Sequence, residues 1–153
     1  MRRVILNGQS YAVGLKWFPF RGTREEAIQE AHGRDTQFDL IVVLTDHEQY
    51  GLGSSEGSSW KKTKSLAASL VRNGCPDAVH VFSFHDENTQ EPFWWVIGIL
   101  KKRISAQSDR CFGNREEAEK LAISIQNSLW KDKAQISRCG IERRCDERFL
   151  YPA

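Results

Sequence analysis

The chain has 153 residues and a formal net charge of +2; 40% of the residues are hydrophobic and 27% are charged. A chain of this length is expected to form one domain that buries a core without disulfide staples, and its composition is close to that of ordinary soluble proteins. The small net charge excludes nucleic-acid binding through overall charge alone, because such binding needs cations clustered on one face.

The cysteines and the start of the chain indicate a cytosolic setting. The four cysteines are widely spaced, form no Cys-x-x-Cys pair, and are Cys75, Cys111, Cys139 and Cys145. We therefore expect free thiols in a reducing compartment and no zinc site. The apolar run after Met1 is too short for a signal peptide, and no run approaches membrane-spanning length.

The first third of the chain predicts a hairpin and a helix. Asn7-Gly8 joins two strand-like runs between residues 2 and 17, and this dipeptide is typical of a two-residue hairpin turn. Thr23 and Glu26 have the spacing of a capping box, which predicts the start of a helix. Gly33 predicts the end of that helix.

The middle of the chain has the form of a strand–helix–strand unit. The apolar run 38–45 predicts a strand that is covered on both faces. A helix is expected over 61–73, with an apolar face made of Leu66, Leu70 and Val71. Another strand begins at Ala78. Such a crossover is right-handed and joins parallel strands of one sheet.

The second half predicts a hairpin and a long helix. Strand 78–84 is followed by a polar turn, and a second strand over 93–104 returns from it. Asn114 is placed to cap a helix over 115–130, which has a clear apolar stripe. Residues 131–153 show only weak periodicity.

These elements predict an α/β domain, with α+β as the alternative, in which about three helices pack on one mixed sheet. We expect residues 1–130 to form the single domain and residues 131–153 to form a C-terminal extension. The sequence shows no internal repeat that would change this interpretation.

The glycine- and serine-rich stretch 51–65 invites comparison with phosphate-binding loops. A Walker A motif needs glycine directly before Lys-Ser or Lys-Thr, but Lys62-Thr63 follows Lys61, and Lys64-Ser65 follows Thr63. The pattern Gly-x-Gly-x-x-Gly also fails, because Glu stands at position 56. We therefore predict no nucleotide and no other cofactor, and we interpret the stretch as a mobile loop.

Two acidic-histidine triplets offer a second kind of site. The first, Asp46-His47-Glu48, and the second, His85-Asp86-Glu87, each follow a predicted strand. If those strands are parallel, both triplets emerge at the same sheet edge, where Asp46, His47, His85 and Asp86 could hold a divalent metal and activate water. The simpler interpretation is that polar residues follow strands because loops meet solvent.

Aromatic and basic residues gather on the later strands. Phe93 and Trp95 point to the face opposite Trp94, so at least one large ring lies on the less buried face. Sheet core is the simpler interpretation, and a partner-binding surface is the other. The basic run Lys101, Lys102 and Arg103 reads as a solvated strand end; an RNA-binding module through it is a further alternative, although no aromatic segment matches an RNA-recognition motif.

Several short motifs resemble those of one known family. They are the opening Gly8-x-x-Tyr-Ala-Val-Gly-Leu-x-Trp17, the strand pair Trp94-Trp95, and Asp109-x-x-Phe-x-x-x-Glu-Glu-Ala118 at a helix entry. In order and spacing they resemble the amino-terminal domain of PilO-type pilin accessory proteins of type IVb pilus systems. The resemblance covers about residues 4–130.

The resemblance implies a non-enzymatic scaffold domain on the cytoplasmic face of a bacterial inner membrane, in front of a membrane-spanning segment outside this chain. It implies contacts with the pilus assembly ATPase and inner-membrane platform proteins, an actin-like or RNase H-like lobe, and no catalytic residues. On this basis we expect Trp94 or Trp95 and the run 101–103 to face a partner, with 51–59 as a mobile loop. A homo-oligomer is a further expected assembly. The alternative function is a small metal-dependent hydrolase or nuclease that uses the two triplets.

Overall fold

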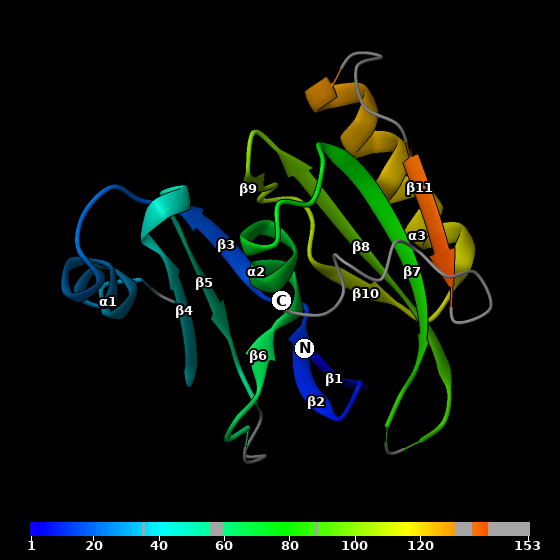
Figure 1. Cartoon of the computed structure of the whole chain (residues 1–153), viewed down its shortest axis with the longest axis horizontal. Coiled ribbons are helices and arrows are strands. Elements are labelled where there is room, and N and C mark those ends of the chain that lie inside the picture. The colour runs from blue at the N-terminus through cyan, green and yellow to red at the C-terminus, as the bar shows by residue number, and fades with distance from the viewer. Residues whose placement is uncertain (35, 56–59, 88, 131–135, 141–153) are drawn as a thin grey trace.

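The computed structural model describes residues 1–34, 36–55, 60–87, 89–130 and 136–140. Within them the chain forms three β-sheets, three α-helices, a 3-10 turn η1 (Thr45–His47) and a π-helical segment η2 (Gln126–Trp130) (Figure 1). The predicted α/β class with three helices is confirmed, but the strands are divided among several sheets instead of forming one. The expected actin-like or RNase H-like lobe stays a prediction.

The first sheet contains the predicted N-terminal hairpin. Strands β1 (Arg2–Leu6) and β2 (Gln9–Val13) pair antiparallel, and Leu6 faces Gln9 across the two-residue turn. Asn7 (φ 50°) and Gly8 (φ 77°) both have positive φ, the pattern of a type I′ turn, so the prediction is confirmed. The short strand β6 (Lys64–Ser65) adds in parallel to β2.

The second sheet has the order β3-β5-β4, from β3 (Lys16–Pro19), β5 (Gln49–Gly53) and β4 (Leu40–Leu44). Helix α1 (Arg24–His32) covers one face, and it begins with the predicted Thr23–Glu26 capping box and ends at Gly33. Strand β4 pairs with β5 alone and is only partly buried along Leu40–Val42. The prediction of a strand covered on both faces is therefore wrong.

Strand β5 corrects the prediction of a mobile loop over 51–59. Gly51 and Gly53 lie inside this strand, which is buried at every position, while residues 56–59 lie outside the described residues. A Cβ atom at Gly51 would stand 3.0 Å from ring atoms of Trp17. Glycine is therefore required here because the indole lies against the strand backbone, and a lack of side chain was mistaken for a loop signal.

The third sheet has the order β10-β8-β7-β11, from β10 (Arg110–Phe112), β8 (Pro92–Leu100), β7 (Ala78–His85) and β11 (Ile136–Gly140); β9 (Arg103–Ile104) also pairs with β8. The predicted β7–β8 hairpin is confirmed. Helix α3 (Arg115–Ile125), capped by Asn114 as predicted, packs on one face of the sheet (Figure 1). Strand β11 pairs parallel to β7, so the sheet reaches past residue 130.

Helix α2 (Leu66–Arg72) fills the centre of the molecule, between the first sheet and the other face of the third (Figure 1). All its residues except Arg72 are buried, so it is covered on every side and not on one face only. The predicted crossover is wrong, because β4 and β7 belong to different sheets. Among the described residues, no helix has the length and hydropathy that crossing a bilayer demands.

Candidate partner-binding surface at the Lys101–Arg103 turn

Asp109 is a buried carboxylate that accepts hydrogen bonds from other parts of the fold. Its carboxylate is 1% exposed and accepts hydrogen bonds from the backbone N–H groups of Gly14 (2.7 Å) and Leu15 (3.1 Å). The indole Nε1 atoms of Trp17 and Trp95 each donate to it as well, at 2.7 Å. Four donors occupy the acceptor sites of both oxygens, so no site is left for a substrate.

This carboxylate also explains the three motifs of the sequence. The opening motif supplies Gly14, Leu15 and Trp17, the Trp-Trp strand supplies Trp95, and the helix-entry motif supplies Asp109 itself. Burial raises the pKa of Asp109, and the four hydrogen bonds act in the opposite direction. The motifs therefore build the junction between the β2–β3 connection and the third sheet.

The two adjacent tryptophans have different surroundings. Trp95 has no exposed surface and donates to Asp109, so the prediction that it faces a partner is wrong: both faces of β8 are covered, and its face meets the central core. Trp94 is partly buried and packs against the cluster beneath α3. The solvent-facing candidate that remains from the sequence is the basic run 101–103.

The basic run forms a two-residue turn between β8 and β9. Leu100 pairs with Arg103, and the residues between them, Lys101 (φ 51°) and Lys102 (φ 61°), both have positive φ. This is the backbone pattern of the Asn7-Gly8 turn, made without asparagine or glycine. The side chains of Lys101, Lys102 and Arg103 are exposed. We refer to Lys101 and Lys102 as the lysine turn.

Buried hydrogen bonds fix the strand on which this turn rests. The Gln49 side chain accepts from the backbone N–H of Ile104 at 2.8 Å and donates to the Ile104 carbonyl at 2.6 Å. Both residues are buried, with Ile104 2% exposed. The Gln49 side-chain amide thus makes the two hydrogen bonds that a neighbouring strand would make with Ile104. It joins β9 to β5, which belongs to the second sheet.

Three further contacts hold the turn itself. The backbone N–H of Lys101 donates to Asp77 Oδ1 at 2.8 Å, from the connection between α2 and β7. The ring of His47 makes a hydrogen bond with the backbone of Lys102. Arg103 forms an ion pair with Glu48, which also lies 3.2 Å from Arg21 Nε.

His47 has both cations and a carboxylate close to its ring. Burial lowers the pKa of His47, as do Lys102 and Arg72, while Asp46 and the Lys102 backbone act in the opposite direction. Because its folded-state pKa lies below the ordinary value, the ring is neutral at pH 7. The turn therefore lies beside a neutral ring.

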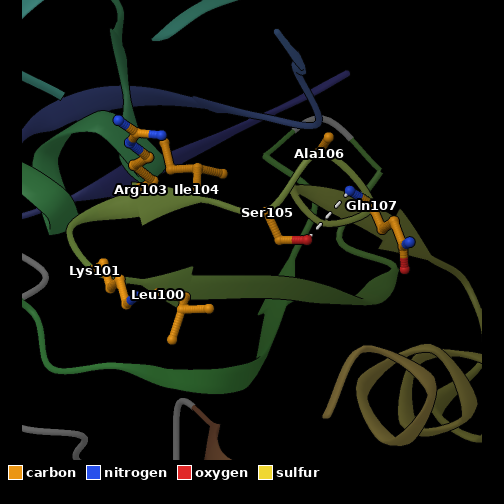
Figure 2. A pocket seen from close by; sticks show the side chains of 7 residues that line it. All are labelled: Leu100, Lys101, Arg103, Ile104, Ser105, Ala106 and Gln107. Atoms are coloured by element: carbon orange, nitrogen blue, oxygen red, sulfur yellow. Dashed lines mark hydrogen bonds between the residues drawn. The ribbon is translucent and has the colours of Figure 1, made fainter. Parts of the chain in front are cut away.

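A pocket of about 550 Å³ lies beside the turn, on β8, β9 and the loop that follows (Figure 2). Its lining combines apolar and cationic side chains with a polar loop: Leu100, Lys101, Arg103, Ile104, Ser105, Ala106 and Gln107. The loop is internally bonded, because Ser105 Oγ accepts from the Gln107 N–H at 3.3 Å and Ser108 Oγ donates to the Ser105 carbonyl at 2.8 Å. The pocket therefore has a fixed wall.

The two acidic-histidine triplets have separate surroundings. Asp46, His47 and Glu48 lie in and after η1, beside the lysine turn. His85 ends β7, and Asp86 forms an ion pair with Arg2 at 3.2 Å, on the N-terminal hairpin. In the part of the chain that the structure describes, no group of three His, Cys, Asp or Glu side chains could hold a metal ion.

A cysteine–histidine pair was not predicted from the sequence. Cys75 Sγ lies 3.3 Å from His80 Nε2, across the connection from α2 to β7. Burial raises the pKa of Cys75 to about 11 and lowers the pKa of His80 to about 4. Both groups therefore stay neutral at pH 7, and the thiol lacks the thiolate character that a nucleophile needs. The spacing of the two residues carries no motif that could have indicated the contact.

Comparison with known proteins shows the fold. No protein-family model matches the sequence, and no curated protein is significantly similar to it. Among solved structures, the chain is similar to the cytoplasmic domain of BfpC, with a TM-score of 0.59 and 15% identity. The similarity covers 99% of this chain and 86% of that one. At this identity the likeness concerns the arrangement of the elements, which is shared over almost the whole chain.

Proposed function

We propose that this chain is a non-catalytic scaffold domain of a type IV pilus assembly platform, on the cytoplasmic face of a bacterial inner membrane. The observation that carries the proposal is the fold likeness to a cytoplasmic domain, that of BfpC, over 99% of the chain. This neighbour links the fold to type IV pilus biogenesis. The motif resemblance to PilO-type accessory domains supports the same setting from the sequence side.

The chemistry of the described residues supports a scaffold more than an enzyme. Asp109 is saturated by four donors, and the Cys75–His80 pair is neutral. The triplet that would supply a metal ligand set instead supports a turn through His47 and Glu48. No described observation favours the hydrolase alternative over this one.

The proposed partners are the pilus assembly ATPase and the inner-membrane platform proteins, with membrane attachment through a segment outside this chain. The test is co-purification of the tagged chain with the ATPase of the same pilus system, followed by isothermal titration of the two purified proteins. We expect a saturable complex of defined stoichiometry. Sedimentation of the chain alone checks for homo-oligomers.

A matched negative control is an assembly ATPase from an unrelated pilus system, which should not bind. If neither the cognate ATPase nor any platform protein of the same system binds the chain, the proposal is wrong. The enzyme alternative would instead be correct if the chain hydrolysed a phosphodiester or ester substrate. That hydrolysis would have to depend on added Mn²⁺ or Zn²⁺ and on His47 and His85.

A further inference from the structure

We propose that the lysine turn and the pocket beside it bind an acidic segment of a partner protein, one that carries an apolar residue between its carboxylates. This inference rests on the proposed function and adds the place and the chemistry of docking.

The backbone of the turn is unusual for its residues. Among the described residues, Lys101 and Lys102 are the one pair of consecutive non-glycine residues with positive φ. Glu48, which pairs with Arg103, also has positive φ (54°). Side chains with a Cβ atom are disfavoured in this conformation, and such outliers gather at functional sites. The turn thus has two lysines, with exposed ammonium groups, at the positions where asparagine and glycine are favoured.

The supports fix the backbone that carries these cations before any partner arrives. Asp77 and His47 bind the two sides of the turn, and Gln49 holds the strand that follows it. A preorganised surface loses less conformational entropy on binding than a flexible one. The lysine turn is therefore suited to recognition and differs from an ordinary solvated loop.

The charge of the turn is available to a partner. Three carboxylates lie around the turn: Glu48 pairs with Arg103 and Arg21, Asp77 accepts from a backbone N–H, and Asp46 interacts with His47. Within the described ranges, Lys101 and Lys102 take part in no ion pair. Two unpaired cations beside a neutral His47 complement a segment rich in Asp and Glu.

The pocket argues for a peptide and against a flat bilayer surface. Leu100 and Ala106 provide the accessible apolar lining, Leu100 next to the turn and Ala106 in the loop after β9 (Figure 2), whereas Ile104 is only 2% exposed. The pocket is open to solvent, and its volume of about 550 Å³ is large enough to admit a side chain. An acidic segment could therefore place an apolar side chain in the pocket while its carboxylates meet Lys101 and Lys102.

The test measures fluorescence anisotropy with two kinds of labelled peptide on the whole chain. The first is a synthetic peptide of Glu and Asp with a central Leu, and the second is a set of peptides tiled over the cognate assembly ATPase. We expect binding by the synthetic peptide and by acidic tiles only. The double substitution K101N/K102G should weaken it by about tenfold or more, and a peptide with Gly in place of Leu should also bind more weakly.

The chain offers a matched control in a second lysine pair. Lys61 and Lys62 are exposed and occupy another turn, closed by a hydrogen bond from Thr63 N–H to the Trp60 carbonyl, and Lys62 also has positive φ (60°). The variant K61N/K62G removes the same charge just before β6, whereas the lysine turn precedes β9 at the other end of the molecule (Figure 1). Peptide affinity should be unchanged in this variant.

Several outcomes would overturn the inference without touching the proposed function. Equal loss in both variants would show attraction by net charge alone. Whole ATPase bound equally by K101N/K102G and by the unaltered chain would place docking elsewhere. Binding to vesicles of phosphatidylglycerol and phosphatidylethanolamine that needs Lys101 and Lys102, with no peptide binding, would assign the turn to a lipid surface. In contrast, if the ATPase does not bind but the synthetic peptide still binds through the turn, the proposed function is wrong and the inference about the turn stands.

Discussion

Two hairpin turns in this molecule have the same backbone pattern and opposite chemistry. The Asn7-Gly8 turn between β1 and β2 uses the residues that a type I′ turn favours, and the lysine turn between β8 and β9 uses none of them. The first has residues whose local preference matches its backbone. The second is held by Asp77, His47 and Gln49. A turn that local preference does not stabilise must be stabilised by its surroundings, and this difference supports the recognition role that we propose for the lysine turn.

The largest expected effect comes from removing the foundation of the lysine turn. Gln49→Ala leaves the buried N–H and C=O of Ile104 without partners and should lower the free energy of unfolding by about 3 kcal/mol. Gln9→Ala is the matched control, because the Gln9 amide bonds carbonyls at the partly exposed side of the molecule. It should cost under about 1 kcal/mol. Urea unfolding measures both, and equal losses would show that β9 is not anchored this way.

A lysine pair at the Asn7-Gly8 turn should be destabilising, because among the described residues no atom lies within 4 Å of a Cβ placed at Gly8. The double substitution N7K/G8K should lower the free energy of unfolding by about 2 kcal/mol, since two lysines would adopt positive φ without compensating contacts. Thermal or urea unfolding measures the change. An unaltered stability would mean that lysine suits this backbone and that the lysine turn needs no special explanation.

The reverse exchange should stabilise the protein. K101N/K102G restores the favoured residues and should raise the free energy of unfolding by about 1 kcal/mol, while it weakens binding of the acidic peptide. Opposite signs for stability and binding in one variant would be the clearest evidence that the turn is kept for recognition. A destabilised variant would show instead that the lysines contribute to the folded state.

The smallest expected effect is on the pH dependence of stability, through His47 beside the lysine turn. The folded-state pKa of His47 is lowered, so the unfolded state binds a proton more readily, and stability falls as the pH drops from about 6.5 toward the lowered value. His47→Asn should flatten part of this slope. His80 contributes in the same direction, so the difference between the chain and its variant is the quantity to measure. If the free energy of unfolding had the same pH dependence in both proteins, His47 would not contribute to the stability of the turn.

The sequence was a good guide wherever a signal is local. The Asn7-Gly8 turn, the Thr23–Glu26 capping box and the Asn114 cap depend on neighbours a few residues away, and all three are present. Strand β5 was missed because Gly51 is required by the indole of Trp17, which is 34 positions distant in the chain. The crossover prediction failed because periodicity defines elements and cannot say which sheet they join.

The candidate site could be predicted only in part. The run 101–103 is visible as a basic cluster, whereas its supports come from separate segments that carry no pattern linking them to it. The sequence suggests a different chemistry for His47 and Glu48, that of an acidic-histidine metal site. Trp95 was misplaced because alternation along a strand separates two faces but does not tell which of them a second layer covers.

The Asp109 carboxylate imposes an order of events during synthesis. Its donor at Gly14 lies 95 residues earlier in the chain, so the connection leading into β3 has no acceptor until most of the protein has left the ribosome. The N-terminal hairpin can form alone, but its attachment to the third sheet must wait for that one side chain. Trp17 and Trp95 both donate to it, so their combined emission should report the moment at which the early and late parts of the nascent chain meet.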